Sequence, residues 1–242
     1  GAIAGVLSAQ MGAGNDTVEL KAAPLATGTV VIEFGEGTDT LDLGGIDVSG
    51  ANLTLTGLEN IKIDSTGAKF NGSTLNGQKY TILGTNGNTD TFTVVTGATD
   101  ENIDLSGLTV SDSVSTGIKG AIITGGAGVN VLTGTSRDDT IDGDAGNDTI
   151  NGGAGDDIIT GGAGADILTG GTGNDNFIFV SFVDTKNSLF DVNNTSAANI
   201  DSITDFVGNG VNTGDTITLT TGALGFAGTS ASTTGTLTTT FV

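Results

Sequence analysis

Aspartate recurs in one phase through the second half of the chain, at intervals of nine residues. The aspartates of this phase are Asp139, Asp148, Asp157, Asp166 and Asp175, and Asn130 stands one interval before them. Carboxylates in a row repel one another unless cations lie between them. Calcium takes about 6–8 oxygen ligands from carboxylates and backbone carbonyls, whereas Mg²⁺ prefers to keep its waters. The spacing therefore predicts a row of calcium sites.

The residues around these aspartates indicate short strands joined by glycine-rich turns. Residues 125–178 fall into six nine-residue units without an insertion, and each unit begins with glycine. The sixth position carries the aspartate or asparagine, and the eighth position is always apolar. An apolar side chain between polar neighbours is typical of a strand with one buried face, and glycine permits the positive φ angles of tight turns. The eighth-position residues are Leu132, Ile141, Ile150, Ile159, Leu168 and Phe177.

Two such units would make one 18-residue coil of a parallel β-solenoid, which gives three coils over residues 125–178. Stacked coils lie about 4.8 Å apart, so aspartates one full coil apart should share an edge. The predicted pairs are Asp139 with Asp157, Asp148 with Asp166, Asp157 with Asp175, and Asn130 with Asp148. Carbonyl oxygens of the loop glycines are expected to complete the calcium shells. These are Gly126, Gly128, Gly146, Gly153, Gly155, Gly162, Gly164, Gly171 and Gly173.

The unit pattern G-G-x-G-x-D-x-U-x, in which U is a large apolar residue, resembles the calcium-binding nonapeptide of RTX proteins. The resemblance implies an all-β fold, a parallel β-roll with calcium between its coils. It also implies export by a type I secretion system and folding outside the cell, where calcium is met. The chain departs from the pattern at Arg137 and Asp144, which stand at glycine positions, and at Asn130, which stands at an aspartate position.

Two weaker copies of the unit lie upstream, MGAGNDTVE at 11–19 and FGEGTDTLD at 34–42. Their aspartates, Asp16 and Asp39, are separated by one coil plus five residues. We expect a five-residue bulge near Pro24, and one calcium ion shared by Asp16 and Asp39. The glycines of these turns, also expected to contribute carbonyls, are Gly12, Gly14, Gly35 and Gly37.

Three regions are predicted from these patterns. Residues 1–118 form an irregular β-rich region with the two degenerate turns, 119–180 form the β-roll, and 181–242 form a β cap. Within the first region, T-G-L-E-N-I at 56–61 resembles elements interleaved with RTX turns in bacterial surface-layer proteins. The tail from 227 to 242 stands where RTX proteins carry their export signal, and a final strand is the alternative.

The predicted cap contains one further resemblance. Asp201, Ile203, Asp205 and Phe206 resemble the D-x-I-x-D-F segment that closes RTX rolls. A cap is physically required, because the end of a roll exposes apolar side chains and unpaired backbone groups.

Composition excludes several functions. The chain has no Cys and no His, which excludes a zinc finger, a cysteine nucleophile and a Ser-His-Asp triad. With one Tyr and no Trp it also lacks the aromatic residues of most sugar sites, so we expect no enzyme. A net charge of -21 repels nucleic acid. The apolar segment of residues 1–7 is too short to span a membrane.

The expected function is a secreted, calcium-dependent structural protein that assembles with itself into a lattice or filament on the cell surface, as surface-layer proteins do. Cell-surface polysaccharide, bridged by calcium, is an expected further partner. The alternative is a C-terminal calcium-folding and export module of a larger RTX exoprotein, such as a protease, lipase or adhesin.

Overall fold

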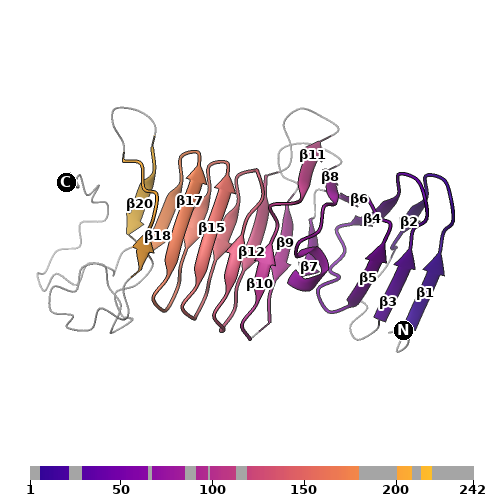
Figure 1. Ribbon diagram of the computed structural model, residues 1–242, viewed down its shortest axis with the longest axis horizontal. Helices are drawn as coiled ribbons and strands as arrows, with labels where there is room; N and C mark the ends of the chain where they lie inside the picture. Colours follow the sequence, from indigo (N-terminus) through magenta and orange to yellow (C-terminus); the bar gives the residue numbers. More distant parts are fainter. Residues whose placement is uncertain are drawn as a thin grey trace, which may run out of the picture.

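The computed structural model describes residues 6–21, 29–64, 67–84, 91–97, 99–112, 119–179, 201–208 and 214–219. Apart from one helical turn, the regular structure of these residues consists of short strands, and every ladder between strands is parallel. Figure 1 shows the strands stacked coil upon coil along the long axis of the molecule, from β1 near the N-terminus to β20. The predicted all-β fold of stacked parallel strands is confirmed.

Successive strands of the nonapeptide region alternate between two sheets. One sheet has the order β10-β13-β15-β17-β19 and the other β20-β18-β16-β14-β12-β9-β7. The first contains β13 (Val131–Thr133), β15 (Thr149–Ala154) and β17 (Ile167–Thr172). The second contains β12 (Ala121–Thr124), β14 (Thr140–Asp142), β16 (Ile158–Thr160) and β18 (Asn176–Phe179). Leu132 pairs with Ile150 and Ile141 with Ile159, so the predicted 18-residue coil is confirmed.

The upstream region also coils, with longer and less even turns. A three-stranded sheet consists of β1 (Val6–Gln10), β3 (Thr29–Glu33) and β5 (Asn52–Thr56). A five-stranded sheet consists of β2 (Thr17–Glu19), β4 (Thr40–Gly44), β6 (Asn60–Ile63), β8 (Thr81–Gly84) and β11 (Thr109–Asp112). Val18 pairs with Leu41, so the predicted offset of one coil plus five residues is confirmed. The bulge expected near Pro24 lies outside the described residues.

The middle of the chain has coils with three sides. The successive strands β5, β6 and β7 (Ala68–Asn71) belong to three different sheets, and β9 (Phe92–Val95) extends the sheet that β7 begins. The single helical turn α1 (Gly72–Leu75) contacts β5, β7 and β10 (Asn102–Asp104). This turn lies between β5 and β10, where a further strand would otherwise continue that side of the stack (Figure 1).

One continuous hydrophobic core runs through the stack from Val30 to Phe177. All six eighth-position side chains of the nonapeptide units are fully buried at 0% exposure, as predicted. The residues beside them point outward, and Ile158 and Ile167 are 40% and 48% exposed. The two sheets of the roll and this core contain residues from both sides of residue 118, since β9 pairs with β12 and β10 with β13.

Glycines allow the turns of successive coils to approach closely. A Cβ on Gly164 would overlap the carbonyl oxygen of Gly146, the glycine at the same position of the preceding coil, and the Gly164 φ is 148°. Among the described residues, Asp144 is the one non-glycine residue with positive φ, at 69°. This aspartate therefore occupies a glycine position in a conformation that L-residues adopt at a cost of about 1–2 kcal/mol.

Arg137, which replaces a turn glycine, joins the two parts of the stack. Its Nη2 donates to the carbonyl oxygen of Val110 at 3.2 Å. Val110 belongs to β11, the terminal strand of the five-stranded sheet. The guanidinium therefore satisfies a backbone acceptor at the edge where this sheet ends.

A further coil follows the nonapeptide units. The strand β19 (Ser202–Ile203) pairs with β17, and β20 (Thr216–Leu219) pairs with β18. Both connections are longer than a coil of the roll, because Leu168 pairs with Ile203 and Phe177 with Ile217. These strands continue both sheets beyond residue 180. The rest of the predicted cap, including the tail from 227 to 242, lies outside the described residues.

Candidate metal sites

Each sixth-position aspartate is hydrogen-bonded to the coil before its own. The N–H of Asp139 donates to Oδ1 of Asp157 at 2.7 Å, and the N–H of Asp157 donates to Oδ1 of Asp175 at 2.9 Å. The same bond, at 2.8 Å, joins Asn130 to Asp148 and Asp148 to Asp166. The four predicted pairs therefore lie one above the other, as the 18-residue period requires.

In three of these carboxylates the second oxygen is buried and accepts no hydrogen bond. Oδ2 of Asp148, Asp157 and Asp175 has no donor, although each residue is only 1% exposed. A buried polar group left unsatisfied costs about 1–3 kcal/mol, and more when it is charged. Buried oxygens of this kind are suitable ligands for a cation.

Oδ2 of Asp157 and of Asp148 each lies beside the first glycine of its own unit, next to a carbonyl oxygen of the following coil. Oδ2 of Asp157 and the carbonyl oxygen of Gly170, in the next coil, both approach the point where a Cβ of Gly152 would lie, the carbonyl at 2.6 Å. Oδ2 of Asp148 and the carbonyl of Gly161 approach Gly143 in the same way. A carboxylate and a carbonyl oxygen so close together can contact one Ca²⁺, whose bonds to oxygen measure about 2.3–2.6 Å.

The electrostatics of the aspartates agree with this geometry. Burial, reinforced by the charges of Asp139 and Asp175, raises the pKa of Asp157 to about 8. Burial and the charge of Asp166 raise the pKa of Asp148 to about 6. The ionised carboxylates are thus destabilised in the fold by desolvation and mutual repulsion. A divalent cation would remove both effects.

Asp139 differs from Asp148, Asp157 and Asp175 because protein groups satisfy both of its oxygens. Its Oδ1 accepts the N–H of Ala121, and its Oδ2 accepts the N–H of Thr135 at 2.6 Å. The Thr135 hydroxyl lies 3.0 and 3.1 Å from the two oxygens. Burial still raises the pKa of Asp139 to about 6. The sequence predicts Asp139 as a calcium ligand, and that role stays a prediction, with Thr135 as a neighbour the pattern did not identify.

The upstream column contains the predicted pair and one residue that the sequence analysis missed. The N–H of Asp16 donates to Oδ1 of Asp39 at 2.7 Å. The N–H of Asp39 donates in turn to Oε2 of Glu59 at 2.8 Å. Glu59 therefore takes the place of a third aspartate, in the coil that follows Asp39. Only its position before β6 could have indicated this, since glutamate is not part of the nonapeptide pattern.

The further coil extends both aspartate columns. Oδ1 of Asp201 accepts the N–H of Asp166 at 2.9 Å, and Oδ1 of Asp215 accepts the N–H of Asp175 at 3.0 Å. Asp205 accepts the N–H groups of Gly170 and Gly171 at 3.0 and 2.7 Å. The sequence analysis assigned Asp201 and Asp205 to a closing segment, and missed that Asp201 and Asp215 each stand directly before a short strand, as the earlier aspartates do.

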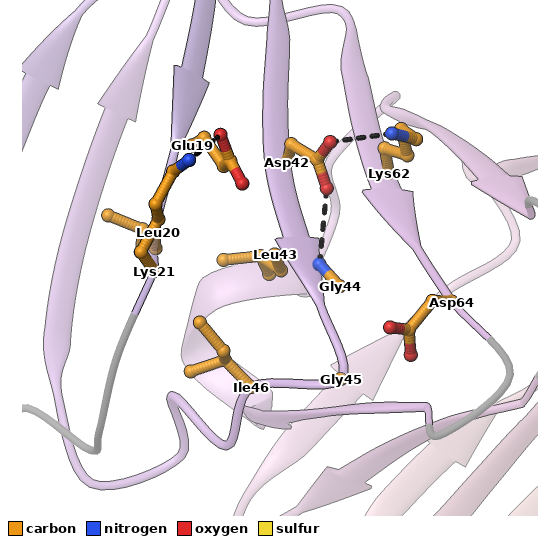
Figure 2. Close-up of a pocket in the computed structure, with 10 residues that line it drawn as sticks. All are labelled: Glu19, Leu20, Lys21, Asp42, Leu43, Gly44, Gly45, Ile46, Lys62 and Asp64. Carbon is orange, nitrogen blue, oxygen red and sulfur yellow. Dashed lines mark hydrogen bonds and ion pairs between the residues drawn. The ribbon is translucent and has the colours of Figure 1, made fainter.

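The structure also has an open pocket of about 440 Å³ at the ends of β2, β4 and β6. Figure 2 shows Asp42 between Lys62 and the N–H of Gly44, at 2.6 and 3.2 Å, and Glu19 beside Lys21 at 3.0 Å. Lysines thus balance two of its carboxylates. The pocket therefore lacks the unsatisfied carboxylate oxygens that mark the turns.

The turns offer carboxylate and carbonyl oxygens, a set of ligands that fits calcium, and not a cluster of acidic side chains. In the described ranges, no three acidic side chains converge on one point, so backbone carbonyls must supply most of each shell. Hard oxygen ligands of this kind, with few charges, suit Ca²⁺. The ligand roles of the individual glycines, Gly126 to Gly173 and Gly12 to Gly37, stay predictions.

Comparison with known proteins agrees with the geometry. A family model of four copies of the RTX calcium-binding nonapeptide repeat matches residues 124–159 and 145–177. The matched segment contains the aspartates from Asp139 to Asp175. The column of Asp16, Asp39 and Glu59 lies outside it, as do Asp201 and Asp215. No curated protein matches the chain.

Proposed function

Since residues 124–177 are RTX calcium-binding nonapeptide repeats, we propose that the chain is a structural protein of the cell surface that assembles with itself when calcium binds. RTX repeat proteins are typically secreted, and they bind Ca²⁺. No helix among the described residues has the length and apolarity to cross a membrane. We further propose that the assembly is a lattice or filament of surface-layer type.

The observation that carries the proposal is the column of buried carboxylates with unsatisfied oxygens. Calcium that binds only the folded chain stabilises it by about 2.7 kcal/mol per site at 100 times the Kd. Four such sites would contribute about 11 kcal/mol, which is comparable with the whole stability of a domain, about 5–15 kcal/mol. Calcium can therefore determine whether the roll is folded.

Self-association follows from charge and from the outer faces of the sheets. Each bound Ca²⁺ adds two positive charges, so four ions would reduce the net charge from -21 to about -13. The faces then carry exposed apolar side chains in line, such as Ile122 and Ile158 on one sheet and Val131 and Ile167 on the other. We propose no catalytic role for the chain. We propose cell-surface polysaccharide, bridged by calcium, as a further partner.

The test is a calcium titration followed at once by circular dichroism, light scattering and electron microscopy. We expect β structure to form first, and scattering and regular assemblies to appear at higher calcium, both reversed by chelator. A chain that folds fully but stays monomeric at high concentration would instead indicate the export and folding module of a larger exoprotein.

A further inference from the structure

The upstream coils contain buried carboxylate oxygens that the matched repeats do not explain. Asp39 is fully buried at 0% exposure, and its Oδ2 accepts no hydrogen bond, whereas its Oδ1 accepts the N–H of Asp16. Oδ2 of Asp16, one coil earlier, is likewise buried without a donor. The calcium ion predicted between Asp16 and Asp39 stays a prediction, and Oδ2 of Asp39 is a ligand that a second ion can use.

The geometry of the roll indicates where each oxygen points. In the roll, Oδ1 faces the preceding coil and Oδ2 lies beside a carbonyl of the following coil, as Asp157 shows with Gly170. By this geometry Oδ2 of Asp16 points to the junction of the first coil, which contains Asp16, with the second coil, which contains Asp39. Oδ2 of Asp39 then points to the junction of the second coil with the third coil, which contains Glu59.

The second and third coils both supply further oxygens at that junction. Glu59 is half-buried, and its Oε2 accepts the N–H of Asp39 at 2.8 Å, which fixes the carboxylate against the second coil. Gly57 lies two residues before Glu59, and the carbonyl oxygens of Phe34 and Gly35 approach its Cβ position at 2.6 and 3.1 Å. Neither ion pair of the described residues involves Asp39 or Glu59.

We propose that Asp39 and Glu59 hold a calcium ion between the second and third coils, outside the RTX repeats. The donors are two carboxylates and backbone carbonyls, the same types as in the roll. One carboxylate, however, comes from a glutamate, in the short turn between β5 and β6. The inference rests on the calcium binding in the proposed function, and it does not depend on self-association.

Tyr80 provides a spectroscopic probe of this junction. Asn60 pairs with Thr81, so Tyr80 stands one coil after Glu59 in the same column, and it is buried. It is the single tyrosine of a chain that has no tryptophan. Tb³⁺ replaces Ca²⁺ in oxygen sites and emits when a nearby tyrosine is excited. Emission excited through tyrosine therefore reports an ion near Tyr80. Because Tyr80 is hydrogen-bonded to Thr109 of β11, and β11 contacts Arg137 of the repeats, the Asp157→Asn variant separates this ion from those of the roll.

The experiment titrates the full chain with Tb³⁺ and then displaces it with Ca²⁺, in the wild type and in Glu59→Gln, Glu36→Gln and Asp157→Asn variants. Glu36 is an exposed glutamate of the second coil and is the matched control. We expect tyrosine-excited emission with equal half-saturation in the wild type, Glu36→Gln and Asp157→Asn. Glu59→Gln should need at least a tenfold higher concentration.

Two results would overturn the site. One is a Glu59→Gln titration equal to that of the wild type, and the other is a wild type that binds Tb³⁺ in equilibrium dialysis without tyrosine-excited emission. If circular dichroism shows that Glu59→Gln has lost β structure, Glu59→Asp decides, because it keeps the charge but withdraws it by one methylene. An unchanged half-saturation in Glu59→Asp would overturn the site as well. Failure of the roll itself to bind calcium would instead refute the proposed function.

Discussion

The carboxylates of the roll lie in surroundings that disfavour their own charge. Asp157 shows this most clearly, because its neighbours one coil away on either side, Asp139 and Asp175, are themselves buried aspartates. In Asp148, Asp157 and Asp175 a backbone N–H satisfies Oδ1, so the unsatisfied charge is concentrated on Oδ2. The residue is thus arranged for a proton or for a cation.

The stability of the calcium-free chain should therefore fall as the pH rises. The pKa values of Asp148 and Asp157 are raised from 3.8 to about 6 and about 8 in the fold. Their favourable contribution is complete below pH 3.8 and is lost as the pH rises through 6 and 8. Urea unfolding in chelator between pH 4 and 9 measures this. Excess calcium should abolish the trend, and a calcium-free chain that gains stability towards pH 8 would contradict it.

Neutralising one buried aspartate should remove calcium, whereas neutralising its exposed neighbour should not. Asp157→Asn and Asp156→Asn change the net charge equally, and both keep an Oδ1 acceptor for the N–H groups of Asp139 and Asn174. Equilibrium dialysis should show fewer calcium ions bound to Asp157→Asn, and an unchanged number in Asp156→Asn. Equal stoichiometry in the two variants would reject Oδ2 of Asp157 as a ligand.

The turn glycines should differ sharply in their tolerance of alanine. Gly77→Ala meets open space, and its φ of 65° alone should cost about 1–2 kcal/mol. Gly164→Ala also drives a Cβ into the carbonyl of Gly146, which should add about 1–3 kcal/mol from overpacking. Thermal unfolding in calcium compares the two. A Gly164→Ala variant as stable as Gly77→Ala would mean that the coils can separate at this turn.

At the scale of the elements, buried and exposed side chains alternate along each strand of the roll. Ile159→Ala should cost about 2–5 kcal/mol, because the side chain is completely buried in the shared core. Ile158→Ala, its neighbour on the outer face, should change stability by about 0.5 kcal/mol. Unfolding in urea with saturating calcium tests the pair, and similar losses in both variants would contradict the assigned faces.

The sequence predicted the elements wherever a fixed period governs them. The nine-residue phase alone placed Ile141 over Ile159 and Asp148 over Asp166, because every coil there has the same length. Upstream, the strand offsets vary, since the step from Val18 to its partner Leu41 is longer than the step from Asn60 to Thr81. No period then indicates which segment becomes α1, or that Glu59 joins the aspartate column. The hydrogen bonds from Thr135 to Asp139 could not be predicted for another reason. They form within a single turn and depend on its detailed conformation.

The described residues form a stack in which each inner coil is stabilised by its two neighbours. The proposed calcium sites join adjacent coils at the turns, so calcium should increase the cooperativity of the stack as well as its stability. We expect the unfolding transition to sharpen and to move to higher temperature as calcium is added, with the midpoint set by the free calcium concentration. Calorimetry measures this, and a midpoint that does not move between chelator and millimolar calcium would refute it.

The parallel ladders also determine how the molecule bears a load. Strands pair from coil to coil, so their hydrogen bonds lie along the long axis, and tension applied to the two ends opens the stack one coil at a time. An 18-residue coil of the roll that unravels releases about 60 Å of extended chain. The stack would therefore dissipate mechanical energy in a series of steps, one coil at a time, and the calcium concentration would set the force of each step. Optical tweezers should record a regular sawtooth in calcium and a low, featureless extension in chelator. A single large rupture in calcium would show that the coils yield together.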